Sequence, residues 1–112
     1  MAQIDWNDFE KVEMRVGKIV SAEAFPEAHN PSYLLQLDFG DELGRRQSAA
    51  ALAQDYELLE LEGRLVVAVT NFPPKQIANH VSQVLVLAAV QADGSLRLLQ
   101  PDADSELGAL IR

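Results

Sequence analysis

Short stretches in which apolar and polar residues alternate dominate the chain, and this is the pattern of strands with one buried face. Residues 33–39 give the clearest example, with the sequence YLLQLDF. Residues 12–24 form a longer stretch in which the alternation changes parity near Gly17, so we predict a bulge or bend near that glycine. Further strands are predicted at residues 45–48, 65–69, 84–90 and 96–99, the last of them after the hairpin signal Asp93-Gly94.

Helical signals are few and short. Asp5 is placed to cap a first helix over about residues 4–11. The alanine-rich run 49–52 follows the third strand, and its high helix propensity predicts a short helix there. Residues 71–82 are expected to form a loop that two prolines stiffen. Five principal strands with a helix after the third are the plan of an oligonucleotide-binding barrel. We therefore predict an all-β, five-stranded OB-fold barrel with short flanking helices.

Length and composition fit one globular domain over residues 1–112. Apolar residues make up 48% of the chain and charged residues 23%, so a protein of this size has enough apolar residues to form one hydrophobic core. The absence of cysteine excludes disulfides and thiolate metal sites. The N-terminus is acidic where a signal peptide would be basic, and the longest apolar run, residues 84–92, is about half a membrane span. We expect a cytoplasmic protein without membrane insertion.

The net charge of −8 opposes any general attraction to nucleic acid, because phosphate binding depends on Lys and Arg. Acidic residues gather in two segments, 55–62 and 102–106, whereas the basic residues are spread. Any nucleic-acid site must therefore be local. A continuous basic face that joins Lys18, one of Arg45 or Arg46, and Lys75 would favour a dedicated nucleic-acid-binding module.

Residues for catalysis or metal binding are scarce. The two histidines, His29 and His80, lie about fifty residues apart without a spaced partner, and neither stands in a nucleophile-elbow context. We expect no enzymatic activity, no metal and no cofactor. A small-molecule-binding or enzymatic barrel stays open as an alternative, and a deep pocket that joins one of these histidines to nearby acids would favour it.

Segment 71–82 is the richest in groups that bind ligands, with amide, hydroxyl, imidazole and ammonium side chains in twelve residues. Phe72 could stack on a base or fill a gap in the core. A second polar cluster, Arg45-Arg46-Gln47-Ser48, could face a phosphate backbone. Adjacent residues of a strand point to opposite faces, so one of its two arginines at most would serve such a face.

Several ordered motifs between Asp8 and Pro101 resemble the CsaA-like branch of the tRNA-binding-domain family, small proteins described as secretion-related chaperones. The motifs are DFEKV at residues 8–12, RVG at 15–17, FPEA at 25–28, LDFG at 37–40, VAVTNFPPKQIA at 67–78, SQVLVL at 82–87 and LLQPD at 98–102. The chain departs from the family pattern at His29, Asn30 and Leu34, and again at residues 48–51, where SAAA replaces SSAQ.

The resemblance implies an OB-fold barrel, a homodimer and a nucleic-acid site in the loop that follows the fourth strand. The residues that match or flank that site are expected to bind tRNA: Asn71, Pro74, Lys75, Gln76, Ser82, Arg45, Arg46 and Ser48. Three side chains are expected to contact polypeptide clients: Phe72, His29 and His80.

The leading hypothesis is a homodimeric chaperone for unfolded or secretory polypeptides with weak tRNA binding, and the alternative is a tRNA-binding module with no chaperone role. The dimer interface is expected at the N-terminal helix and at the C-terminal extension, about residues 101–112, because a small barrel cannot cover all of their apolar residues. Those residues are Ile4, Trp6, Phe9, Leu107, Leu110 and Ile111.

Overall fold

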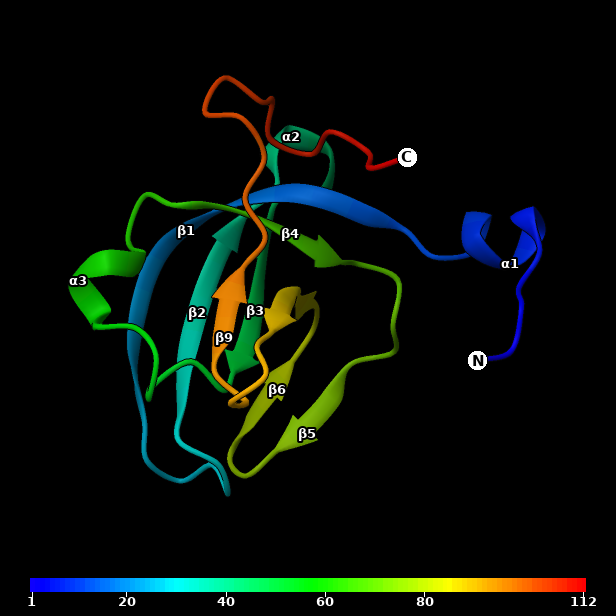
Figure 1. Cartoon of the computed structure of the whole chain (residues 1–112). Helices are drawn as coiled ribbons and strands as arrows, with labels where there is room; N and C mark the ends of the chain where they lie inside the picture. The colour runs from blue at the N-terminus through cyan, green and yellow to red at the C-terminus, as the bar shows by residue number, and fades with distance from the viewer.

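A strongly curled antiparallel sheet forms the body of the protein in the computed structural model, which covers residues 1–112 (Figure 1). The strand order in this sheet is β3-β2-β1-β4-β7. The strands are β1 (Met14–Phe25), β2 (Ser32–Asp38), β3 (Arg45–Ala50), β4 (Leu65–Val69) and β7 (Leu85–Val86). Two hairpins stand outside the sheet: β5 (Lys75–Ile77) with β6 (His80–Ser82), and β8 (Ala88–Val90) with β9 (Leu96–Leu98).

The three helices are short. Helix α1 (Trp6–Glu10) begins with a capping box, since Asp5 accepts a hydrogen bond from the Asp8 amide and the Asp8 carboxylate accepts one from the Asp5 amide. Helix α2 (Gly40–Leu43) joins β2 to β3, and helix α3 (Leu58–Leu61) precedes β4. The first helix therefore follows the prediction for residues 4–11.

The core lies inside the curl of the sheet. Its largest fully buried side chains include Ile19, Leu35, Leu37, Phe39 and Leu61, contributed by β1, by β2 and the residue after it, and by α3. The alternation in residues 33–39 predicted this buried face, although Leu34 on the opposite face is buried as well.

The bulge in β1 lies at Val20, where the pairing with β2 shifts register between Ile19 and Ser21. The strand therefore has the predicted bulge, but at Val20 rather than at Gly17 itself. Gly17 instead allows the ring of Phe39 to approach, because a Cβ atom on Gly17 would stand 2.7 Å from Phe39 Cε1.

The alanine-rich run is not a helix. Strand β3 continues through Ala50, and pairing with β2 places Ala49 opposite Leu34 and Ala50 opposite Tyr33. Residues 49–52 are extended or bent, because strand pairing outweighs the helix propensity of alanine. The short helix between the third and fourth strands is α3, further along the chain.

Two other element predictions need correction. Segment 71–82 contains the β5–β6 hairpin, with Ala78 and Asn79 in its turn, and so it is not a plain loop. The strand predicted over residues 84–90 is divided into β7, which pairs with β4, and β8, which pairs with β9.

Polar contacts close the barrel between β3 and the end of β6. The Gln47 amide nitrogen donates to Gln83 Oε1 at 2.8 Å, and the Gln83 amide returns a bond of 2.8 Å to the Gln47 carbonyl. The Ala49 amide donates to Ser82 Oγ at 3.0 Å. The predicted fold class is confirmed: an all-β, five-stranded barrel of OB type with short helices.

The C-terminal residues run along the first half of β1. The Val16 amide donates to the Ala109 carbonyl, and the Gly108 and Ile111 amides donate back to carbonyls of β1. Helix α1, in contrast, stands apart from the barrel at the end of an extended linker (Figure 1). No helix in the structure is long and apolar enough to cross a membrane.

Candidate functional site

A groove lies on the surface of the barrel where strand β3 meets the β5–β6 hairpin. Its first part is a hollow of about 430 Å³ at the root of the hairpin. Phe72 and Leu85 are about half exposed in it, at 53% and 48%. Pro73, Ile77 and Val84 add further apolar surface. This hollow therefore suits the flat or aliphatic part of a ligand.

The second part of the groove is a hollow of about 350 Å³ between the β1–β2 loop and the hairpin. His29 and Asn30 come from that loop, Ala51 from the bend directly after β3 and Gln76 from β5. The loop and the tip of the hairpin lie at the same end of the barrel (Figure 1). Ala49, Lys75 and Ile77 line both hollows, so the two parts form one continuous groove.

The charge of the groove differs from that of the whole chain. No residue that lines either hollow is acidic, although the chain carries 17 Asp and Glu residues. Lys75 is the one charged residue in the lining besides the titratable His29. The ion pairs in the structure join Lys11 to Asp8 and Arg15 to Glu13, so the Lys75 ammonium group has no carboxylate partner. The groove can therefore accept an anion.

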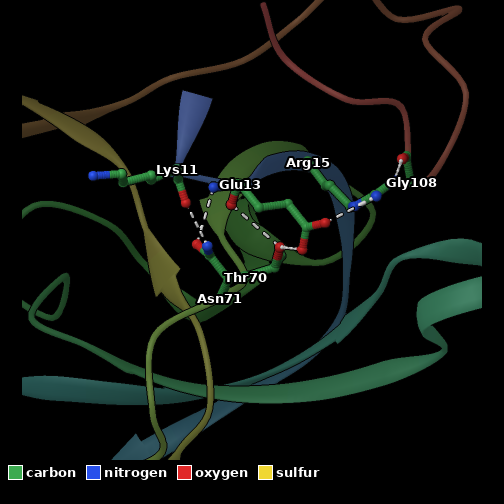
Figure 2. Close-up of polar contacts among 6 residues, drawn as sticks. All are labelled: Lys11, Glu13, Arg15, Thr70, Asn71 and Gly108. Atoms are coloured by element: carbon green, nitrogen blue, oxygen red, sulfur yellow. Dashed lines mark hydrogen bonds and ion pairs between the residues drawn. The ribbon is translucent and has the colours of Figure 1, made fainter. Parts of the chain in front are cut away.

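Asn71 lines neither hollow, and its side chain instead makes hydrogen bonds to the segment between α1 and β1 (Figure 2). Its Oδ1 accepts a hydrogen bond of 2.9 Å from the Glu13 amide, and its Nδ2 donates one of 2.6 Å to the Lys11 carbonyl. The side chain therefore fastens the linker between α1 and β1 to the chain just before Phe72.

A carboxylate network continues from this point (Figure 2). The Thr70 hydroxyl donates to Glu13 Oε2 at 2.6 Å, and Arg15 contacts Glu13 Oε1 at 3.0 Å. These two contacts, Thr70 first, lower the pKa of the Glu13 carboxyl below its ordinary value. Arg15 also donates to the Gly108 carbonyl at 2.8 Å, so the network joins the linker, β4 and the C-terminal segment.

The residues predicted to bind tRNA do not form one cluster. Lys75 and Ser82 line the first hollow and Gln76 the second, whereas Pro74 is exposed outside the lining. Ser48 is 1% exposed and so lies beneath the surface.

Arg45 and Arg46 lie at the other end of β3. Ala49 stands three to four residues further along the strand, which corresponds to about 10–13 Å at 3.3 Å per residue. Arg45 pairs in register with Asp38, and Asp38 with Lys18, so an acid separates these two bases across the sheet. No continuous basic face therefore runs from Lys18 through β3 to Lys75, so the feature that would favour a dedicated nucleic-acid-binding module is absent and any phosphate contact in the groove depends on Lys75.

The two histidines differ in their surroundings. His29 is exposed at the second hollow. His80 is half buried, and its ring packs edge-on against Phe25 with 5.1 Å between ring centroids. No group of three or more His, Cys, Asp or Glu side chains is arranged to hold a metal ion.

A separate apolar surface surrounds α1. Ile4 and Trp6 are 69% and 81% exposed, and with Phe9 and Arg112 they border a hollow of about 540 Å³. Leu107 and Ile111 are half buried, while Leu110 is just exposed. The structure thus brings the last residue of the chain to the first helix.

Sequence reasoning missed several groove residues. Ala49 on β3 and Ala51 in the bend directly after it line the second hollow, and the position of Ala49 would have followed from continuing the third strand beyond residue 48. Leu85 begins β7 with its side chain exposed, and nothing in its local pattern separates it from a core residue.

Comparison with known proteins identifies one matching family model, described as "Putative tRNA binding domain", over residues 14–110. Among curated proteins, the chain is 38% identical over 112 residues to a methionine–tRNA ligase from Thermococcus kodakarensis. The match covers the whole of this chain, which spans 15% of the length of that ligase.

Two solved structures match over nearly the full length of both chains. The CsaA chaperone protein of Picrophilus torridus is 45% identical, with a TM-score of 0.92 over 98% of this chain and 100% of that one. The CsaA chaperone of Bacillus anthracis is 41% identical, with a TM-score of 0.92 over 99% and 100%.

Proposed function

Because the chain belongs to the tRNA-binding-domain family, we propose that it binds tRNA and that an unpaired segment of the RNA lies in the groove where β3 meets the β5–β6 hairpin. OB-type barrels bind oligonucleotides across this kind of strand face and its bordering loops. Lys75, Gln76, Ser82 and Phe72 are the proposed contacts. Asn71 fixes the chain just before Phe72 through its two backbone hydrogen bonds.

The observation that carries the proposal is the charge of the groove. A chain with a net charge of −8 repels polyanions in general, so binding must occur where acidic side chains are missing. The groove lining is free of acids and contains an unpaired Lys75, which meets that condition. Exposed Phe72 adds an aromatic face on which a base can stack.

A binding titration tests this proposal. Lys75→Ala should weaken tRNA binding by about tenfold or more at low salt, because a charge-assisted contact to phosphate is lost. Arg97→Ala is the matched control, since Arg97 is exposed on β9 outside the groove and its loss changes the net charge equally. Equal affinities for the two variants would contradict the proposed site.

We further propose that two copies associate through the surface around α1 and the C-terminal segment. Ile4, Trp6, Phe9, Leu107, Leu110 and Ile111 are the proposed interface residues. Large exposed apolar side chains that gather in one place mark association surfaces. Trp6 is the strongest candidate anchor because it is the most exposed aromatic residue of the helix.

A second candidate function is binding of unfolded or secretory polypeptides, as in a chaperone. The apolar walls of the first hollow favour it, and both structural relatives described above are described as chaperones. In this case Phe72 and His29 would contact the client, and half-buried His80 would support the hairpin through Phe25. Binding of an unfolded client that displaces RNA from the groove would support this candidate.

The proposed activity is binding without catalysis, in the cytoplasm, where tRNA is found. Aminoacylation by the ligases belongs to proteins of which this chain spans 14–16%.

A further inference from the structure

The two hollows of the groove differ in chemistry. The first offers the ring of Phe72 and aliphatic surface from Pro73 and Leu85. Every nucleobase has a flat face that stacks on such surfaces, and this kind of contact does not distinguish one base from another. The first hollow therefore suits the face of a base.

The second hollow is rimmed by groups that form hydrogen bonds. The side chains of His29 and Asn30 make no hydrogen bond within the protein, and the small apolar side chains of Ala28, Ala49 and Ala51 line the same hollow. An imidazole and an amide can each donate and accept. Small apolar side chains beside unpaired polar groups suit a base that lies flat while its edge is bonded.

Lys75 stands between these hollows, because it lines both of them together with Ala49 and Ile77. Side chains two residues apart on a strand lie on one face, so Lys75 and Ile77 point into the groove together. The ammonium group of Lys75 has no carboxylate partner. An ammonium group between two hollows fits a ligand that carries a negative charge midway along its length.

We propose that the groove is a two-nucleotide site for unpaired RNA, with one base in each hollow and the linking phosphate at Lys75. This inference rests on the proposed RNA-binding function and adds the size and division of the site. An apolar peptide would use the first hollow alone, since the second is bordered by polar side chains.

Short ligands of increasing length test the division. The full chain, labelled for amide NMR, is titrated with AMP, pApA and pApApA. We expect pApA to bind at least about fivefold more tightly than AMP, the lower end of the contribution of one stacked base, and to shift amides in both hollows. The third nucleotide should increase the affinity less than the second one does.

Filling the second hollow provides the decisive comparison. Ala51→Leu should retain AMP binding within about threefold but lose the gain from the second nucleotide. Because Ala51 is exposed, the larger side chain should not disturb the core. Ala89→Leu is the matched control, since Ala89 is an exposed residue of β8 outside the groove. Asn30→Ala, which removes a rim group without adding volume, should reduce the same gain.

The outcomes distinguish failure of the two-nucleotide site from failure of the RNA-binding function. The two-nucleotide site is overturned if pApA binds no more tightly than AMP, or if Ala51→Leu leaves the gain in affinity from AMP to pApA intact. Either result would count even if tRNA binding depends on Lys75. The RNA-binding function itself fails if no nucleotide shifts the groove amides and Lys75→Ala leaves tRNA affinity unchanged. Shifts caused by an apolar peptide alone would replace RNA with a polypeptide ligand.

Discussion

Gly17 shows how one residue sets the packing of the barrel. Phe39 is 1% exposed, and a methyl group on residue 17 would lie 2.7 Å from its Cε1 atom, so the buried ring would have to shift. Gly17→Ala should lower the free energy of unfolding by about 1–3 kcal/mol, the usual effect of overpacking a core. Urea denaturation measures this loss.

A double variant controls the experiment. Phe39→Leu removes the ring edge, so Gly17→Ala should be much less destabilising in that background. Equal losses in both backgrounds would show that the ring does not set the requirement for glycine.

The Glu13 carboxyl gives the protein a defined response to acid. Its pKa in the folded state is lowered, chiefly by the Thr70 hydroxyl and then by Arg15. A lowered pKa stabilises the folded state fully above the ordinary glutamate range, about pH 4, and this stabilisation is lost as the pH falls through the lowered value. Thr70→Val should therefore destabilise the protein by about 1 kcal/mol at neutral pH and by less at about pH 2.5.

Unfolding in urea at the two pH values checks this prediction. Thr70→Val in a Glu13→Gln background is the control, because the carboxylate that the hydroxyl bonds is then absent and the loss should not change with pH. A loss in Thr70→Val that does not change with pH would argue against a role for the Glu13 charge.

At the scale of elements, Asn71 connects α1 to the groove. Asn71→Ala removes hydrogen bonds to the Glu13 amide and the Lys11 carbonyl, and so should destabilise the linker by about 1–3 kcal/mol. Hydrogen exchange of the Glu13 amide should become faster, because its acceptor is gone. Asn79→Ala in the hairpin turn, where the side chain makes no hydrogen bond, should leave that exchange rate unchanged.

The sequence predicted those elements whose pattern reflects burial on one face. Strand β2 and the turn at Asp93-Gly94 followed from alternation and turn chemistry, and the structure has both. The alanine-rich run was misassigned because propensity is a local property, whereas pairing with β2 is not. The bulge expected near Gly17 lies at Val20, because a change of parity does not fix the residue at which a strand bulges and Gly17 serves a close contact with Phe39 instead.

The candidate site was predictable in part. Lys75, Gln76, Ser82 and Phe72 were identified from one segment of the sequence, and they do line the groove. Arg45 and Arg46 do not join them, since distance along β3 separates the arginines from Ala49. That the β1–β2 loop lies opposite the hairpin depends on the curl of the sheet, which no local pattern reveals.

At the scale of the whole molecule, the exposed residues of α1 predict a dimer. Trp6→Ser should weaken self-association by at least about 2 kcal/mol, because a large aromatic anchor is lost from the interface. Sedimentation over a range of protein concentrations measures the effect. Leu59→Ser is the matched control, since Leu59 is a similarly exposed apolar residue on α3. A wild-type protein that stays monomeric at all concentrations would contradict the interface.

The central claim is that Lys75 gives an acidic protein a local site for RNA, and the salt dependence of binding tests it most directly. Affinity for single-stranded RNA is measured against salt concentration for the wild-type chain, Lys75→Ala and Arg97→Ala. Each phosphate neutralised by a single-strand site contributes about 0.7 to the log-log slope. We predict that Lys75→Ala reduces the slope by about that amount for each bound copy, whereas Arg97→Ala leaves it unchanged. A slope that is the same in Lys75→Ala and in the wild-type protein would contradict the account.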